Sequence, residues 1–271
     1  MADSKFIANP GSAIGEAVGA SMERALTQKL ESVAGDYGCR YLTSGIASTK
    51  SGAPSKKLLM YDSRGNRYDI DGVFIDGGEH PLILVESKYI RYTKHNRDKG
   101  SWICTAHSAV RRRYHSIRAS VVVLAGNWSH SSMAMMRSND INLFVIPFSL
   151  ISELLAAEGV NFNWEEKDKT RAAAAWRAYS ALPESRKNTV GERMIASIGD
   201  NLASLIGDIL DNSRPRRVQK IVVEIVSNLG ETKVFEFKSV EQAMEFLSRT
   251  ELEKSFLEKD SATLRDIPGQ D

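Results

Sequence analysis

This sequence has few cysteines, a small net charge and no long apolar run. Cys39 and Cys104 are the only cysteines among 271 residues, which argues against a disulfide framework or a cysteine-rich zinc site and favours a reducing cytoplasm. The longest apolar runs, such as residues 121–126, fall far short of the ~20 residues of a membrane helix. The N-terminus lacks the apolar stretch of a signal peptide. We therefore expect a cytoplasmic protein with no membrane partner.

Several common catalytic signatures are also missing. The chain has no Gly-x-x-x-x-Gly-Lys phosphate loop, no His-Glu-x-x-His and no Gly-x-Ser-x-Gly. Its composition, 42% hydrophobic and 26% charged, is that of an ordinary globular protein. This composition excludes a fibrous repeat and wholesale disorder. The net charge of +2 at first disfavours a polyanionic partner.

The order of the expected elements indicates an α/β protein with a mixed central sheet flanked by helices. A helix is expected over residues 12–34, followed by meandering strands that include residues 67–75 and 82–88. Helices and strands then alternate up to about residue 157. The strand over 82–88 is mostly apolar up to its last three residues, which predicts a strand covered on both faces.

We divide the chain into a core over residues 1–160, a helical segment over 161–217 and an appendix over 218–271. The appendix is expected to hold a small β-hairpin, a helix and a frayed C-terminus. In the middle segment, apolar residues at helical spacing predict a face that packs either against the core or against a second subunit as a homodimer. Packing within the chain is the simpler interpretation. The residues are Leu202, Leu205, Ile206, Ile209 and Leu210.

The residues that carry chemistry are Asp71 on one expected strand and Glu86-Ser87-Lys88 at the end of the next. Side chains alternate faces along a strand, so Glu86 and Lys88 point to one side, as do Asp69 and Asp71. A hairpin between the two strands would bring both acidic sets together. Two carboxylates suit Mg²⁺, which prefers oxygen ligands, and a neighbouring lysine can stabilise developing negative charge. The pattern is that of phosphodiester hydrolysis.

The Glu-x-Lys tripeptide alone carries little information, because it occurs four times, beginning at Glu86, Glu165, Glu231 and Glu236. Only the first follows a strand that should be buried, where ionisable groups need partners or a function. The other three fall on a charged helix, a turn and a half-exposed hairpin. The alternative interpretation of the Asp71, Glu86 and Lys88 set is a structural salt-bridge cluster.

These residues and the order of elements resemble the PD-(D/E)xK nuclease superfamily, which has a restriction-endonuclease-like fold. The resemblance covers about residues 12–150 and implies that Asp71 and Glu86 hold Mg²⁺, with Mn²⁺ as a substitute. It also implies that Lys88 acts on the attacking water and that Glu23, on the first helix, lies near the metal. Ile70 stands where the family often has proline. Asp69 competes with Asp71 for the metal role, and an ordinary surface carboxylate is the alternative for Glu23.

A basic, aromatic segment follows the motif. Residues 88–118 contain nine lysines and arginines and one acid, whereas residues 219–271 contain seven bases and eleven acids. The small net charge therefore hides a segment of about +8 beside the proposed metal site, which is what a phosphate backbone requires. The alternative is a solvated helix face. The candidates for nucleic-acid binding are Lys94, His95, Arg97, Lys99, Arg111, Arg112 and Arg113.

Together these patterns predict a Mg²⁺-dependent deoxyribonuclease, an endonuclease of the restriction or antiviral-defence type that acts on double-stranded DNA. The principal alternative is a non-catalytic nucleic-acid-binding module or subunit that keeps the nuclease fold. An RNA-directed nuclease and a protein-interaction scaffold are weaker alternatives.

Overall fold

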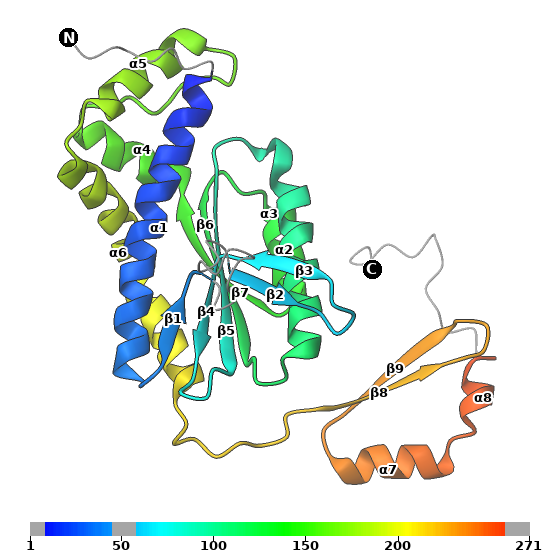
Figure 1. Ribbon diagram of the computed structural model, residues 1–271. Helices are drawn as coiled ribbons and strands as arrows, with labels where there is room; N and C mark the ends of the chain where they lie inside the picture. The colour runs from blue at the N-terminus through cyan, green and yellow to red at the C-terminus, as the bar shows by residue number, and fades with distance from the viewer. Residues whose placement is uncertain (1–8, 45–57, 258–271) are drawn as a thin grey trace. The chain divides into compact units, whose positions relative to one another are not determined.

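The computed structural model describes residues 9–44 and 58–257. The chain divides into two compact units, Met1–Asp211 and Asn212–Asp271 (Figure 1). The first is built on a five-stranded sheet in the order β1-β4-β5-β6-β7, in which β4 is antiparallel to both neighbours and β5, β6 and β7 are parallel. The expected α/β class with a mixed sheet is confirmed. The strands are β1 (Arg40–Leu42), β4 (Gly72–Ile75), β5 (Pro81–Ile90), β6 (Ala119–Gly126) and β7 (Ile141–Pro147).

Helices cover both faces of this sheet (Figure 1). Alternate residues of β6 point to opposite faces, so Val121 and Val123 pack in the cluster that contains α1, whereas Val122 and Leu124 pack in the cluster that contains α2 and α3. β5 is buried from Pro81 to Ser87 and β6 throughout, as their apolar sequences predict. The helices of this unit are α1 (Pro10–Asp36), α2 (Asn96–Arg113), α3 (His130–Ser138), α4 (Phe148–Ala157), α5 (Lys169–Ser180) and α6 (Glu184–Leu210).

The single strand expected over residues 67–75 is wrong, because the chain bends at Asp71 and forms two strands. β3 (Arg67–Ile70) pairs with β2 (Leu58–Tyr61) in a separate two-stranded sheet, and β4 belongs to the main sheet. Gly72, directly after the bend, leaves room for the Tyr41 side chain, since a Cβ at this position would lie 2.0 Å from Tyr41 Oη. Asp71 therefore sits at the junction of the two sheets.

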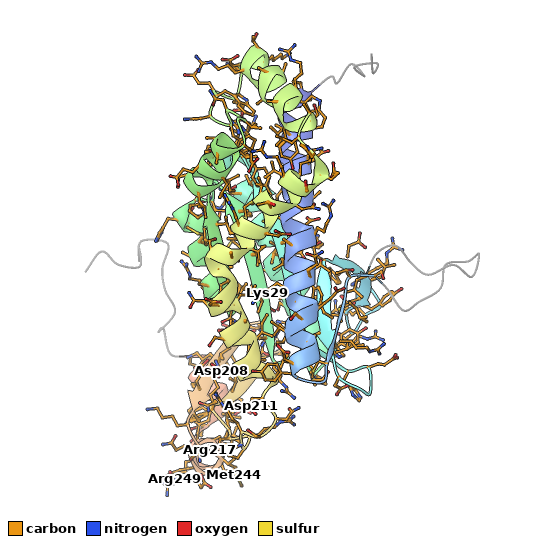
Figure 2. The ribbon with its side chains drawn as sticks, turned by 90° about the vertical axis from the view of Figure 1, so that its left-hand side faces the viewer. Lys29, Asp208, Asp211, Arg217, Met244 and Arg249 are labelled. Carbon is orange, nitrogen blue, oxygen red and sulfur yellow. The ribbon has the colours of Figure 1, made fainter. Side chains whose placement is uncertain are left out.

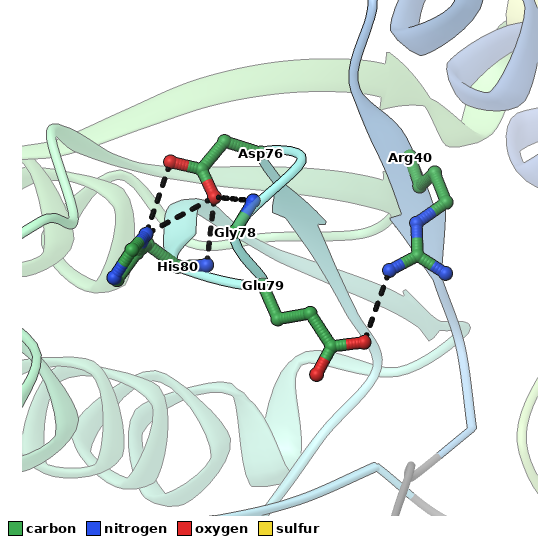
Figure 3. A network of polar contacts seen from close by, with 5 residues as sticks. All are labelled: Arg40, Asp76, Gly78, Glu79 and His80. Carbon is green, nitrogen blue, oxygen red and sulfur yellow. Dashed lines mark hydrogen bonds and ion pairs between the residues drawn. The ribbon is translucent and has the colours of Figure 1, made fainter.

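The turn between β4 and β5 fixes the register of the hairpin that carries Asp71 and Glu86 (Figure 3). Asp76 Oδ1 accepts hydrogen bonds of 2.9 Å from the backbone N–H groups of Gly78 and His80, and Glu79 pairs with Arg40 of β1 at 3.2 Å. These contacts hold a turn in which Glu79 has a φ of 64°. The resulting register places Gly72 opposite Val85, one residue from both acidic positions.

The apolar face of α6 packs against α1 of the same chain. The two helices lie side by side (Figure 2), with Leu202, Ile206 and Leu210 buried in the main core. A Cβ on Gly191 would lie 2.2 Å from the Ser21 carbonyl oxygen, so the backbones are in direct contact. The face that suggested a homodimer is thus used within the chain. No helix of the described residues is both long and apolar enough to cross a membrane.

The second unit is a hairpin of β8 (Ile221–Val226) and β9 (Thr232–Phe237) with α7 (Val240–Arg249) and α8 (Leu252–Ser255). The helix expected from Val240 to about Leu257 ends at Arg249 and resumes as α8. Phe246 of α7 packs on Phe235 and Phe237, at ring-centroid distances of 4.5 and 5.1 Å. Glu236 and Lys238 are exposed, as the alternation of charged and aromatic residues predicts.

Candidate active site

Asp71, Glu86 and Lys88 meet at the bend between β3 and β4. The Lys88 Nζ atom lies 2.9 Å from Asp71 Oδ2 and 2.6 Å from Glu86 Oε1. Glu86 is almost fully buried, with 1% of its side chain exposed, whereas Lys88 and Asp71 are 26% and 36% exposed. The expected convergence of these three side chains is confirmed, and the set opens to solvent on the side of Asp71.

Backbone groups fix the two carboxylates. The Asp71 N–H donates to Glu86 Oε2 at 3.2 Å, and the Ser87 N–H donates to Asp71 Oδ2 at 2.9 Å. These reciprocal bonds cross the hairpin at the point where β4 begins. Because both acceptors are held by backbone donors, the carboxylates keep their orientation without depending on Lys88.

The charges of the three groups influence one another strongly. Burial and the adjacent Glu86 raise the pKa of Asp71 above its ordinary value, against the effect of Lys88. Burial also opposes ionisation of Glu86, but His107 and Lys88 outweigh it and lower the pKa of that carboxyl. The two carboxylates in turn outweigh the burial of Lys88 and raise the pKa of its ammonium group. Lys88 is therefore a cation and hydrogen-bond donor in this arrangement rather than a base.

Glu23 of α1 lines the same cleft. Partial burial raises the pKa of its carboxyl, Asp71 and Glu86 raise it further, and Lys88 and Ser87 act in the opposite direction. The structure thus brings Glu23 into the electrostatic field of the other three groups. Asp69 also lines this cleft, but Asp71 is the carboxylate that contacts Lys88.

This first cleft has a volume of about 520 Å³. Trp102 of α2 forms part of its wall and is 40% exposed, so its ring is available to a ligand as well as to helix packing. The cleft also contains Tyr41 and Thr27. An exposed aromatic ring in an open cleft suits a ligand with a flat part that can stack on it.

Sequence reasoning gave His107 no role at this site. It is 1% exposed, and its Nε2 atom lies 3.9 Å from Glu86 Oε2, while neither ring nitrogen has a hydrogen-bond partner among the described residues. His107 belongs to the buried stripe of α2 with Ile103, Ala106 and Val110. That helical spacing is the signal that places it against β5.

The residues of the first cleft fit a Mg²⁺ ion held through Asp71 and Glu86. Glu86 Oε1 is buried without a partner of hydrogen-bond geometry, so its contact with Lys88 leaves capacity for a second cation. No group of three His, Cys, Asp or Glu side chains within residues 9–44 and 58–257 forms a preassembled metal cage. Mg²⁺ does not need one, since it uses one or two carboxylates together with water and substrate phosphates.

The predicted nucleic-acid-binding residues separate into two groups at opposite ends of α2. Lys94 and Lys99 line a second cleft beside the first, and Arg97 is exposed on the same turn. The side chain of His95 lies outside the part of the chain that the structure describes. Arg111, Arg112 and Arg113 lie at the other end of the helix, about 20 Å away at 1.5 Å per residue. The six residues whose side chains the structure describes therefore do not form one patch.

Three of the arginines in the basic segment have structural partners. Arg113 donates to the Asp62 carbonyl oxygen at 2.9 Å, and Arg118 donates to the Ile209 carbonyl oxygen at 2.8 Å. Arg91 is buried, donates to the carbonyl oxygens of Phe162 and Trp164 at 2.8 and 3.2 Å, and stacks on the Trp164 ring at 3.6 Å. Arg91 thus joins β5 to the loop before α5 and does not add to a phosphate-binding surface.

We expect Arg91→Lys to destabilise the protein by roughly 1.5–3 kcal/mol, because an ammonium group cannot reproduce the forked donors or the stacked plane. Urea unfolding followed by circular dichroism measures the effect. Arg97→Lys is the matched control, because Arg97 is exposed and its replacement should change stability by less than about 0.5 kcal/mol. Equal unfolding midpoints for the two variants would contradict the structural role of Arg91.

Comparison with known proteins leaves the chain without a family. No family model matches it, and no curated protein matches it. Among solved structures, a protein of unknown function, AF1548, matches with 12% sequence identity and a TM-score of 0.31, over 67% of this chain and 98% of the other.

Proposed function

We propose that this chain is a Mg²⁺-dependent nuclease that hydrolyses DNA phosphodiester bonds, an endonuclease of the restriction or defence type related to the PD-(D/E)xK superfamily. The observation that carries the proposal is the Asp71–Lys88–Glu86 contact set, with Glu23 beside it, in an open cleft. Buried charges concentrated at a cleft are typical of catalytic sites.

Each residue of the first cleft is assigned a role that fits its exposure to solvent. Asp71 and Glu86 would hold Mg²⁺, which supplies Lewis-acid stabilisation and lowers the pKa of water. Lys88, a protonated donor at the mouth of the cleft, would bind a non-bridging phosphate oxygen and offset the charge that develops there. The Asp71 N–H would keep Glu86 oriented. Glu23, at the rim, would position water opposite the leaving group.

Incubation of purified protein with supercoiled plasmid tests the activity. We expect nicking or linearisation with Mg²⁺ or Mn²⁺, none with excess chelator, and recovery when Mg²⁺ is restored. End-mapping then separates the classes, since discrete ends indicate a restriction enzyme and dispersed ends a defence nuclease. Plasmid that remains supercoiled at every metal concentration would contradict the proposal.

A non-catalytic nucleic-acid-binding module is the second candidate. The position of Lys88 between the two carboxylates favours this candidate, because a purely structural salt-bridge cluster would have the same contacts. A binding module would retain affinity for DNA and show no metal-dependent change in the plasmid. The same plasmid assay, run beside a gel-shift assay, distinguishes the two.

Two features bear on the location and the assembly of the protein. Cys39 and Cys104 are both free thiols, which is compatible with a reducing cytoplasm. The need to cut two strands is the remaining argument for a homodimer, since the α6 face that suggested one is buried against α1.

A further inference from the structure

A second cleft of about 610 Å³ lies at the N-terminal end of α1, next to the first cleft. Its walls come from α1, the end of β5, the short 3-10 helix η1 (Thr93–His95), the start of α2 and α5. They include Gly15, Tyr89, Lys94, Lys99 and Lys169. This volume is in the range of small-ligand pockets. It admits a nucleotide-sized group but not a double helix, whose major groove alone is about 12 Å wide.

The two clefts follow one another along the same elements. Lys88 lines the first and Tyr89, the next residue of β5, lines the second. On α1 the lining passes from Glu23 to Glu16, about 10 Å at 1.5 Å per residue. That separation corresponds to about three nucleotides at 3.4 Å per nucleotide. One strand that occupied both clefts would therefore extend a few nucleotides beyond Lys88.

The charge changes sign between the clefts. The first contains the carboxylates Glu23, Asp69, Asp71 and Glu86 around Lys88. In the second, Lys94, Lys99 and Lys169 are exposed on three different elements and form no ion pair among the described residues. Glu16 and Glu166 line it too, and the positive end of α1 adds to its basic character. The second cleft thus suits backbone phosphates.

Tyr89 lines the second cleft and carries a buried hydroxyl. Its Oη atom is buried without a hydrogen-bond partner among the described residues, and burial raises the pKa of the phenol, so it stays protonated. Its ring packs across α1 at two glycines, where a Cβ on Gly15 would lie 3.2 Å from Tyr89 Cε1. A buried hydroxyl without a partner is unfavourable, and an oxygen of a ligand in the cleft would satisfy it.

We propose that the second cleft binds the phosphate backbone of a single strand that leads away from the scissile phosphate, through Tyr89 Oη, Lys99 and Lys169. At the cut the substrate is then an unpaired strand, such as a frayed end or a locally unwound stretch of supercoiled plasmid, rather than a fully paired duplex. Trp102, on the wall of the first cleft, stacks a base next to the cut. The inference rests on the proposed function, because it assumes that the strand is cleaved in the first cleft and runs from there into the second.

Binding can be tested without cleavage. Fluorescence anisotropy of a labelled oligodeoxythymidine in chelator measures affinity and its salt dependence for three variants. We expect Tyr89→Phe to weaken binding about tenfold with no loss of thermal stability, because only a hydroxyl without a partner is removed. Lys169→Glu should weaken binding by at least about tenfold and reduce the salt slope by about 0.7 for each phosphate that is no longer neutralised. Lys167→Glu, two residues away and outside the cleft, should stay within about twofold of the wild type.

The outcomes separate this inference from the nuclease proposal. If Tyr89→Phe and Lys169→Glu bind the strand as Lys167→Glu does while the wild type cuts plasmid, the subsite is wrong and the nuclease stands. If both variants lose affinity but the wild type never cuts, the subsite stands and the nuclease fails. If both variants lose as much affinity for a blunt duplex as for the single strand, the single-strand assignment is overturned.

Discussion

Lys88→Ala and Asp71→Asn should each lower the rate of plasmid cleavage by at least about 100-fold. Lys88→Ala removes the cation that lies 2.9 Å from Asp71 Oδ2 and 2.6 Å from Glu86 Oε1, and with it the donor for a phosphate oxygen. Asp71→Asn keeps the size of the side chain and removes the charge required to hold Mg²⁺. Initial rates of supercoiled plasmid loss at saturating Mg²⁺ measure both effects.

The sequence provides a matched control for Lys88→Ala. Lys238 ends the same kind of tripeptide, Glu236-Phe237-Lys238, but lies exposed at the end of β9 in the second unit. Lys238→Ala should cut plasmid at the wild-type rate. Circular dichroism and thermal melting must show that the two site variants remain folded. Undiminished nicking by both would contradict a catalytic role and favour the structural salt-bridge cluster.

The convergence of the site could be predicted because it depends on local rules. A period of two places Glu86 and Lys88 on one side of β5, and the polar residues of 76–80 predict the turn that pairs β5 with β4. Both features are present, and the ion pairs follow from them. The neighbouring residues also distinguish the two tripeptides. Aromatic residues that alternate with charges predict that Glu236 and Lys238 are exposed, whereas the apolar run before Glu86 predicts that its strand is buried.

The bend at Asp71 could not be predicted, because residues 67–75 have the composition of one strand. In the structure, residues 67–70 pair with β2 whereas residues 72–75 pair with β1 and β5. That division between two sheets is decided by tertiary pairing. The bend has a functional consequence. It moves Asp71 out of regular pairing, so its backbone N–H is available to Glu86 Oε2.

Charge counting located the basic segment but not its geometry. Nine bases in residues 88–118 indicated one phosphate-binding surface. Arg91 and Arg118 instead donate to backbone carbonyls, Lys88 belongs to the first cleft, and the remaining bases divide between the two ends of α2. Lys169 of α5, from the segment outside the expected core, joins Lys99 at the second cleft. A linear sequence does not show which bases are taken up by structural roles, since that depends on tertiary partners.

Gly126→Ala should destabilise the first unit by roughly 2–5 kcal/mol, the largest stability effect we expect from adding one methyl group. Gly126 ends β6 with a φ of 95°, which costs an L-residue about 1–2 kcal/mol. A Cβ there would also lie 1.9 Å from the Ile90 carbonyl oxygen, so the end of β5 must move, at a further cost of about 1–3 kcal/mol. The Ile90 carbonyl accepts a hydrogen bond from the Asn127 N–H at 2.8 Å, and that bond would be strained as well.

Urea unfolding followed by tryptophan fluorescence reports on the first unit alone, because all four tryptophans, Trp102, Trp128, Trp164 and Trp176, lie in it. Gly35→Ala is the control, since Gly35 is helical and a Cβ there meets nothing within 4 Å. Alanine at that position should leave stability unchanged or raise it by up to about 1 kcal/mol. Because Ile90 lines the second cleft beside Tyr89, Gly126→Ala should also weaken single-strand binding while the protein remains folded. Equal urea midpoints for the two alanine variants would contradict the close approach of Gly126 to the Ile90 carbonyl oxygen.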